Sequence, residues 1–265
     1  MRAPAATASK RKTFSIASKT RSSPISSRFF VEGTHELGEV VELLGGDARK
    51  VVAVLRMNSG DTIEVIDSAA QRFSATLTLA NHRVTAHLDT LSTASEIAGR
   101  WRITLAQALP KGQKMDFVIE KATELGIAEI FPLFCERTVV DDVGPGKLER
   151  WRRLAKTAAQ QCGRSTVPEV NDAQSLTGFV PCFKNYDTIL FPWELAGPQP
   201  LRETLPPLVE RAREILIIIG PEGGFSSDEA ARAKDAGAHL ISLGTRILRT
   251  ETAALVVLAI LNYVS

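Results

Sequence analysis

The stretch that begins at Arg249 brings together side chains able to do chemistry. Arg249, Thr250, Glu251 and Thr252 follow one another between the apolar pair 247–248 and the small-residue start of the last predicted helix. Helix capping explains part of this pattern, with Thr250 as the N-cap and Glu251 favouring the helix N-terminus. Capping does not explain an arginine and a glutamate held between apolar residues at the end of a strand. This unexplained pair makes the stretch a candidate functional site.

A glycine-rich elbow, "GPEGG" at residues 220–224, directly follows the apolar strand "EILIII". Its glycines allow positive φ and close backbone approach, and Pro221 stiffens the turn. Ser226 and Glu229 form a capping box that starts the next helix. One interpretation is a strand-to-helix turn that binds nothing. A phosphate loop is disfavoured because no G-K-[ST] follows and Glu222 would repel phosphate, and the stretch is not a dinucleotide G-x-G-x-x-G element. An acidic, glycine-rich rim suits a ligand with hydroxyl groups and a positive centre.

The elements that must position these two stretches alternate between strand and helix from Trp101 onward. Strands are predicted at 102–109, 128–135, 186–194, 214–220 and 239–244, and helices at 114–126, 146–163, 226–237 and about 251–263. This alternation predicts an α/β domain whose parallel sheet is covered on both faces. The last three of these strands end in loops, and such loops gather at one edge of a parallel sheet to form a ligand crevice.

The chain before this domain has a different character. Residues 28–92 contain short β-rich segments separated by Gly, Asn, Asp and Ser, which predict a small β-barrel with a helical segment near 47–55 and a turn at 56–61. Residues 93–99 are small and polar, as in a linker. Residues 1–27 contain no acidic side chain and predict a disordered basic extension, an RNA-attracting tail or an organelle transit peptide.

Composition excludes several classes of protein. The 265 residues carry a net charge of only +2, so any basic face must come from local clustering. Three widely separated cysteines argue for a reducing compartment and against a disulfide framework or a zinc ribbon. The four histidines show no ligand spacing, so no metal is expected. The longest apolar run, 255–261, is too short to span a bilayer.

Four motifs, in the same order, resemble the 16S ribosomal RNA (uracil-N3)-methyltransferases of the SPOUT superfamily. They are "ITLAQALPKGQKMDFVIEKATELGIAEIFPL", "WRRLAKTAAQQCGRSTVPEV", "IIIGPEGGFSSDE" and "SLGTRILRTETAAL". The segments "RFFV" and "VLRMNSGD" resemble the N-terminal domain of the same family. The resemblance covers nearly the whole chain from Arg28 to the C-terminus.

The resemblance implies a PUA-like, RNA-binding β-barrel at 28–92 and a SPOUT methyltransferase domain at 100–265 with a trefoil knot. It implies S-adenosyl-L-methionine as cofactor, 16S rRNA or the small ribosomal subunit as substrate, and a homodimer whose active sites use both subunits. It implies neither a membrane nor a metal partner. The residues expected to enclose the cofactor are Gly220, Pro221, Glu222, Gly223, Gly224, Leu243, Gly244, Ile247, Leu248 and Ala253.

Methyl transfer to uracil N3, which the resemblance implies, gives expected roles to residues 249–252. Arg249 is expected to stabilise negative charge on the uracil carbonyl oxygens. Glu251 would orient Arg249 or take the N3 proton, and Thr252 would hold the base or the cofactor. Glu222 would face the ribose or offset the sulfonium charge.

RNA contacts are expected from cations and amides at loops and helix ends, above all in 110–114 and 160–165. The principal candidates are Arg28, Arg56, Lys111, Gln113, Lys114 and Arg164, with Arg152, Arg153 and Lys156 as further ones.

Other functions remain open at this level. The chain could be an inactive RNA-binding homologue, a knotted methyltransferase that acts on a ribose 2′-hydroxyl or on tRNA, or a nucleotide-binding module. A bacterial source would place the protein in the cytoplasm. A plant or algal source would make residues 1–27 a plastid or mitochondrial address.

Overall fold

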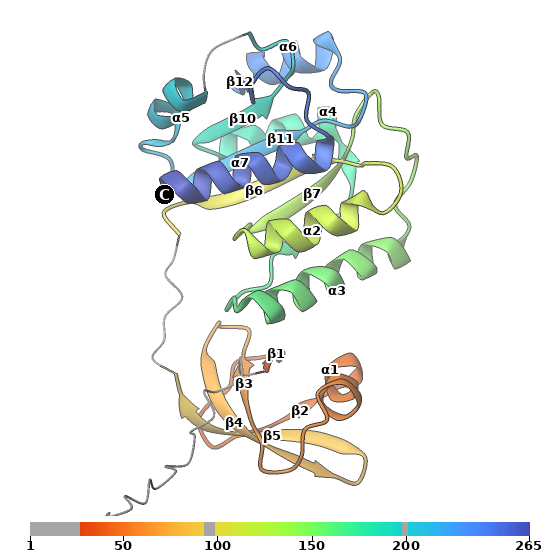
Figure 1. The fold of residues 1–265 in the computed structure, drawn as a ribbon, viewed down its shortest axis with the longest axis vertical. Coiled ribbons are helices and arrows are strands. Elements are labelled where there is room, and N and C mark those ends of the chain that lie inside the picture. Colours follow the sequence, from red (N-terminus) through yellow and green to blue (C-terminus); the bar gives the residue numbers. More distant parts are fainter. Residues whose placement is uncertain (1–26, 93–98, 198–200) are drawn as a thin grey trace, which may run out of the picture.

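The computed structural model describes residues 27–92, 99–197 and 201–265, which form two sheets. The smaller sheet lies below the larger α/β part, and the two are joined through α3, Pro145–Cys162 (Figure 1). The predictions for residues 1–26 and 93–98 lie outside the described residues.

The smaller sheet is a curled, five-stranded half-barrel with the order β1-β3-β4-β5-β2. Its strands are β1 (Arg28–Phe30), β2 (Val40–Leu43), β3 (Thr62–Ile66), β4 (Arg72–Ala80) and β5 (Arg83–Leu91). Strand β1 pairs parallel with β3, and all other pairs are antiparallel. In β4 the residues Phe73, Ala75 and Leu77 alternate into the core, as the period of two predicts. The predicted helical segment is present as α1 (Gly45–Arg49), which continues as the π-helix η1 (Lys50–Val54).

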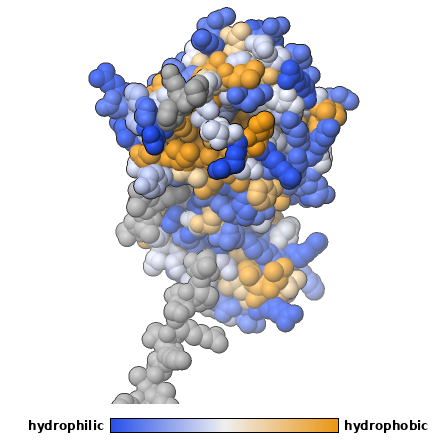
Figure 2. Space-filling view, turned by 45° about the horizontal axis from the view of Figure 1, so that its top comes forward, coloured by the Kyte–Doolittle hydropathy of each residue, from blue (hydrophilic) through white to orange (hydrophobic). Residues whose placement is uncertain are grey.

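The half-barrel also carries apolar side chains on its solvent-exposed surface. Val40, Leu44 and Val54 are 62%, 70% and 70% exposed, respectively. Figure 2 shows an apolar area on the smaller part of the molecule, separate from the mixed apolar and hydrophilic surface of the larger part.

The larger sheet is parallel throughout its described pairs, and its order is β12-β10-β11-β6-β7-β8, with β9 on β7. Its strands are β6 (Arg102–Ala108), β7 (Glu129–Phe134), β8 (Glu169–Val170), β9 (Gln174–Ser175), β10 (Thr188–Pro192), β11 (Glu214–Ile219) and β12 (His239–Ile241). Its helices are α2 (Lys114–Glu124), α3, α4 (Leu176–Phe179) with the 3-10 turn η2 (Val180–Asn185), α5 (Leu201–Val209), α6 (Ser227–Asp235) and α7 (Thr250–Val264). The predicted α/β architecture is therefore confirmed, and the trefoil knot stays a prediction.

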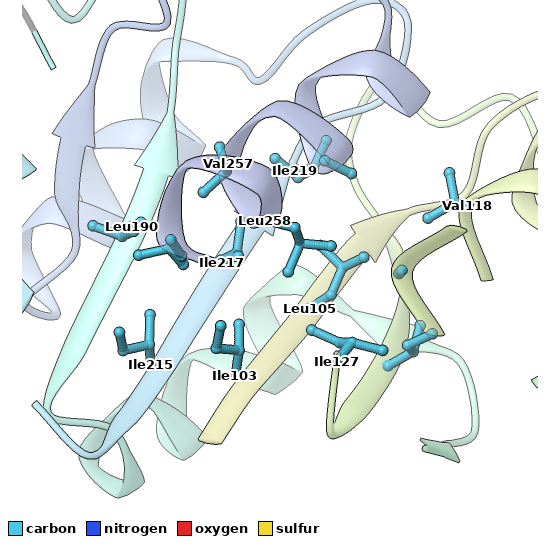
Figure 3. Close-up of a cluster of buried hydrophobic side chains, with 14 of the residues drawn as sticks. Ile103, Leu105, Val118, Ile127, Leu190, Ile215, Ile217, Ile219, Val257 and Leu258 are labelled. Carbon is cyan, nitrogen blue, oxygen red and sulfur yellow. The ribbon is translucent and has the colours of Figure 1, made fainter. Parts of the chain in front are cut away.

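The helices cover both faces of this sheet because its central strands are apolar on both sides. In β11, Ile215, Ile217 and Ile219 point to the side of α2, α3 and α7, whereas Leu216 and Ile218 point to the side of α4 and α6. Figure 3 shows Val257 and Leu258 of α7 seated on β6 and β11, with Leu190 of β10 beside them. This packing fixes the first turn of α7, and with it Arg249, relative to the carboxyl ends of the strands.

Polar contacts join the two parts of the chain. Asp47 accepts hydrogen bonds from Lys156 at 2.8 Å and from Gln160 at 3.0 Å, both on α3. On the other side of the contact, Arg72 of β4 donates to the Ser165 hydroxyl at 2.6 Å. These bonds tie the half-barrel to the C-terminal half of α3 and the loop after it.

Candidate active site

A cavity of about 730 Å³ opens at the carboxyl ends of β10, β11 and β12. It is lined by all ten residues expected to enclose a cofactor and also by Arg249 and Lys114. Three loops meet there because the three strands are parallel neighbours, as the crevice rule for such sheets predicts. The residues expected around the cofactor thus line one cavity, and their role in holding it stays a prediction.

The glycines of the elbow make the close packing of these loops possible. A Cβ on Gly220 would lie 3.0 Å from the ring of Phe225, and one on Gly224 would lie 2.7 Å from Oε1 of Glu194. Gly224 also has a φ of +67°, which L side chains rarely adopt. The capping box predicted for the following helix is present, with Ser226 Oγ accepting from the N–H of Glu229 and Glu229 accepting from the N–H of Ser226.

The acidic residue of the elbow is paired within the protein. Glu222 Oε1 accepts from Lys114 Nζ at 2.8 Å and from the main-chain N–H of Lys111 at 3.1 Å. Burial works to raise the pKa of Glu222, but the hydrogen bonds from Lys114 and Lys111 outweigh it and lower that pKa. The same bond raises the pKa of Lys114. Lys114, which was expected to bind RNA, thus lies on the rim of the cavity and holds the elbow to the first turn of α2.

The loop after β10 supplies residues that the sequence analysis did not single out. Trp193 and Glu194 both line the cavity. Among the described residues, Nε1 of Trp193 is buried without a hydrogen-bond partner. Glu194 is exposed, and its carboxylate lies against Gly224. The crevice rule predicted that this loop would reach the site, but "PWE" has no glycine pattern that would have indicated which side chains matter.

The interpretation of Thr250 as an N-cap is wrong. The N-cap of α7 is Arg249, with φ −65° and ψ 152° and no side-chain cap, and Thr250 is already helical. The Thr250 hydroxyl instead donates to the carbonyl of Gly220 at 2.6 Å and accepts from Gln107 Nε2 at 2.8 Å. A partner on a distant strand outcompetes the local cap because the hydroxyl is buried between the sheet and the helix.

The three residues with expected catalytic roles lie around the start of α7 but differ in their surroundings. Arg249 is exposed and lines the cavity. The side chain of Glu251 is 14% exposed, and its Oε2 lies 3.8 Å from Lys114 Nζ without a hydrogen-bond partner among the described residues. The ion pair of Glu251 is therefore with Lys114 and not with Arg249. Thr252 is exposed and does not line the cavity.

Several residues expected to bind RNA have contacts within the protein. Arg28 pairs with Glu64 and donates to the carbonyl of Arg164 at 3.2 Å. Arg164 donates to the carbonyls of Thr123 and Ile127, at 3.1 Å and 2.6 Å, and so closes the end of α2. The side chain of Arg28 therefore serves the contact between the two parts of the chain, whereas that of Arg164 binds the end of α2 within the α/β part.

The further basic candidates on α3 have similar contacts. Lys156 binds Asp47, and Arg152 pairs with Glu149 and Asp172. Arg153 is exposed and donates to the carbonyl of Glu149 at 3.3 Å. This face of α3 is largely occupied by intramolecular bonds.

The remaining candidates are open to solvent. Arg56, Lys111 and Gln113 are exposed, and Arg56 has a positive φ of 51° at the start of its turn. Lys111 and Gln113 lie in the loop that leads into α2, beside the rim of the cavity that Lys114 and Glu222 form. These three side chains are available to a ligand at the surface.

The cavity fits S-adenosyl-L-methionine in size and in chemistry. Its volume lies in the range of small-molecule sites, and Leu243, Ile247, Leu248 and Ala253 give it an apolar wall. Glu194 and Glu222 are carboxylates suited to ribose hydroxyls or to positive charge, and the main chain of the glycine loops offers further polar groups.

Among the described residues, no group of three or more His, Cys, Asp or Glu side chains could hold a metal ion. Within the same ranges, no helix is long and apolar enough to cross a membrane.

Comparison with known proteins agrees with this geometry. The family model described as an RNA methyltransferase domain matches residues 98–262. Ribosomal RNA small subunit methyltransferase E of Bacillus subtilis is 31% identical over 254 residues, which cover 89% of this chain and 96% of that protein. The protein of the same name from Synechocystis is 34% identical over 209 residues, which cover 79% of this chain and 68% of that protein.

Solved structures give the same result. A putative methyltransferase from Legionella pneumophila in complex with bound SAM has a TM-score of 0.80 and 31% identity, and the match covers 90% of this chain and 98% of that one. Ribosomal RNA small subunit methyltransferase E from Neisseria gonorrhoeae, bound to S-adenosyl methionine, has a TM-score of 0.79 and 29% identity, with the same coverage. The match of fold, of cavity and of sequence over nearly the full length leads to one conclusion: the chain belongs to the RNA methyltransferase domain family, together with the ribosomal RNA small subunit methyltransferases E.

Proposed function

We propose that this protein transfers a methyl group from S-adenosyl-L-methionine to N3 of a uridine in 16S rRNA of the small ribosomal subunit. The observation that carries the proposal is the single cavity wall formed by the elbow and the 242–249 loop, with Arg249 at its edge. The relatives named above are rRNA methyltransferases, and two of the structural neighbours hold the cofactor. The substrate is part of a ribosome, so we place the protein in the cytoplasm of a bacterial source, or in a plastid or mitochondrion if residues 1–27 are a transit peptide.

The cofactor, when bound, supplies a methyl carbon attached to a positively charged sulfur. The apolar residues Leu243, Ile247 and Leu248 would exclude water around it, and Glu194 would accept hydrogen bonds from its polar groups. Glu222 is less suited to that task than expected, since its carboxylate already holds Lys114. In this way the protein holds the methyl donor in place while the uracil base approaches from the side of Arg249.

The N3 proton of uracil must leave before or during attack, which leaves negative charge on the ring oxygens. Arg249 is exposed at the edge of the cavity and would stabilise that charge through its guanidinium group. Glu251 would take the proton, since its Oε2 has no hydrogen-bond donor among the described residues. Lys114 Nζ, 3.8 Å from that oxygen, would hold the carboxylate of Glu251 in place. Thr252, which is exposed next to Glu251, would contact the base.

We further propose that residues 28–92 form an RNA-binding domain and that residues 100–265 form the methyltransferase domain, which acts as a homodimer. Ile247 is 90% exposed although it lines the cofactor cavity, and Tyr263 at the end of α7 is also 90% exposed. A second subunit would cover such apolar side chains. Lys111, Gln113 and Arg56 would contact the RNA backbone.

One experiment tests the proposed reaction. Small-subunit rRNA from cells with and without the gene is digested to nucleosides, and N3-methyluridine is measured by mass spectrometry. We expect this nucleoside to disappear without the gene and to return with the native protein but not with Arg249→Ala. Unchanged N3-methyluridine, together with a lost 2′-O-methyl nucleoside, would instead support the ribose-directed alternative.

A further inference from the structure

Gln107 is a polar side chain in the middle of the parallel sheet. It belongs to β6 and is fully buried, at 0% exposure. Among the described residues, its Oε1 has no hydrogen-bond partner. An amide in the centre of an apolar sheet destabilises the fold unless its polar atoms are used, so its presence calls for a role.

The orientation of this amide is fixed by its neighbours. Nε2 donates to the carbonyl of Ala108 at 3.0 Å and to the hydroxyl oxygen of Thr250 at 2.8 Å. A carbonyl can only accept, so the nitrogen of the amide and not its oxygen must face Ala108. Thr250 therefore receives a hydrogen bond from Gln107 and cannot give one to it.

The hydroxyl of Thr250 then has one way to use its own hydrogen. Thr250 is 5% exposed, and the carbonyl of Gly220 lies 2.6 Å from its oxygen. Because the side of the hydroxyl that faces Gln107 is occupied by a donor, the hydrogen must point to Gly220. The three residues form a chain of hydrogen bonds with one direction, from β6 through the first turn of α7 to the elbow.

The peptide group at the end of this chain can be held only through its carbonyl. It joins Gly220 to Pro221, and proline has no N–H to bind from the other side. Gly220 and Pro221 both line the cofactor cavity, and a Cβ at Gly220 would meet the Phe225 ring at 3.0 Å. Within residues 27–92, 99–197 and 201–265, the Thr250 hydroxyl is the hydrogen-bond donor that fixes the plane of this peptide.

We propose that Gln107 is a positioning residue: through Thr250 it orients the Gly220–Pro221 peptide and keeps the cofactor loop and the start of α7 in one geometry. Gln107 does not line the cavity and touches neither cofactor nor substrate in this assignment. Its effect on cofactor binding comes from the direction that its N–H group imposes on the Thr250 hydroxyl. The proposal rests on the assignment of the cavity to S-adenosyl-L-methionine.

The substitution Gln107→Glu tests the direction of the chain. A neutral carboxylic acid at this position keeps one donor, whereas an ionised one can only accept and would turn the Thr250 hydroxyl away from Gly220. Burial raises the pKa of an introduced carboxyl group towards neutrality. Binding of S-adenosylhomocysteine is measured by calorimetry between about pH 6 and about pH 9, where we expect affinity of this variant to fall by about tenfold as pH rises. The native protein and Gln174→Glu, on the short strand β9, should show no such fall.

If Gln107→Glu does not fold, two variants of Thr250 test whether its hydroxyl supports cofactor binding. Thr250→Ser keeps the hydroxyl and should bind S-adenosylhomocysteine like the native protein, whereas Thr250→Val, which has the same shape, should bind about tenfold more weakly. Equal affinity of the two, or a Gln107→Glu variant that binds like the native protein at every pH, would overturn the proposal. A native protein that does not bind S-adenosylhomocysteine would instead overturn the assignment of the cavity, so the two failures are distinguishable.

Discussion

Glu222 Oε1 and Lys114 Nζ lie 2.8 Å apart and join two segments that are 108 residues apart in the sequence. One belongs to the elbow after β11 and the other to the first turn of α2. A lysine at a helix N-terminus is unfavourable for the helix dipole, so its place is explained by the carboxylate that it binds. The pair closes one side of the cofactor cavity, since both residues line it.

Breaking this pair should weaken cofactor binding modestly. Both side chains are about one-third exposed, at 35% for Lys114 and 30% for Glu222, so solvent screens their attraction. We expect Lys114→Met and Glu222→Gln each to weaken S-adenosylhomocysteine binding by roughly threefold, and the double variant to be little worse than either single one. Calorimetric titration of the four proteins measures the coupling, and fully additive losses would show that the two residues act separately.

Acid should disrupt the same contact. The pKa of Glu222 lies below its ordinary value of 4.5, so its contribution to stability is present above that value and is lost as pH falls through the lowered pKa. The Tm of the native protein minus that of Glu222→Gln should therefore be constant from neutral pH down to about 4.5 and shrink below it. Differential scanning calorimetry over this range measures the difference, and a difference that already shrinks near neutrality would contradict the assignment.

Arg249 should matter for turnover more than for cofactor binding. It is exposed at the rim of the cavity, where it can reach a base. We expect Arg249→Ala to lower kcat by about a hundredfold, as for the loss of one preorganised donor, with cofactor affinity changed little. Transfer of a labelled methyl group to small subunits measures the rate. Arg202→Ala, at an arginine side chain that is 83% exposed on α5, is the matched control and should keep full activity.

Glu194 should contribute to cofactor affinity. It lines the cavity, and Gly224 leaves the space for its carboxylate, whereas Glu222 is engaged by Lys114. We expect Glu194→Gln to weaken binding of S-adenosylhomocysteine by about tenfold, because hydrogen bonds to a charged acceptor are stronger than those to a neutral one. Glu210→Gln, at an exposed carboxylate next to α5 and outside the cavity, serves as control. If both variants bind alike, Glu194 has no part in recognition.

Lys111 and Arg56 should contribute to RNA binding through charge. Both are exposed, and each phosphate contact that is lost lowers the salt dependence of binding. We expect Lys111→Ala and Arg56→Ala each to reduce the slope of log K against log salt by about one. Filter binding to small-subunit rRNA at several salt concentrations measures this slope. Lys184→Ala, on η2 next to α4, should leave it unchanged.

The sequence alone predicted α2, α3, α6 and α7 and the strands β6, β7, β10, β11 and β12, but not β8, β9, α4, η2 or α5. The period of apolar residues predicted α2 and α3, and Gly163, with a φ of 90°, ends α3 as expected. The family resemblance indicated the expected cofactor residues, all of which line the cavity. The capping box at Ser226 and the glycine-bearing turns follow from neighbouring residues. Such features depend on residues a few positions apart, and their physics is local.

The partners of the polar side chains could be decided only by the tertiary structure. Thr250 binds Gly220 and Gln107 instead of capping its own helix, and Arg28 and Arg164 bind main-chain oxygens instead of remaining free for RNA. Glu194 reaches the cavity from a loop without a distinctive pattern. A hydroxyl, a guanidinium or a carboxylate takes the best partner within reach, and that reach is set by how distant strands and helices pack, which no short stretch of residues contains.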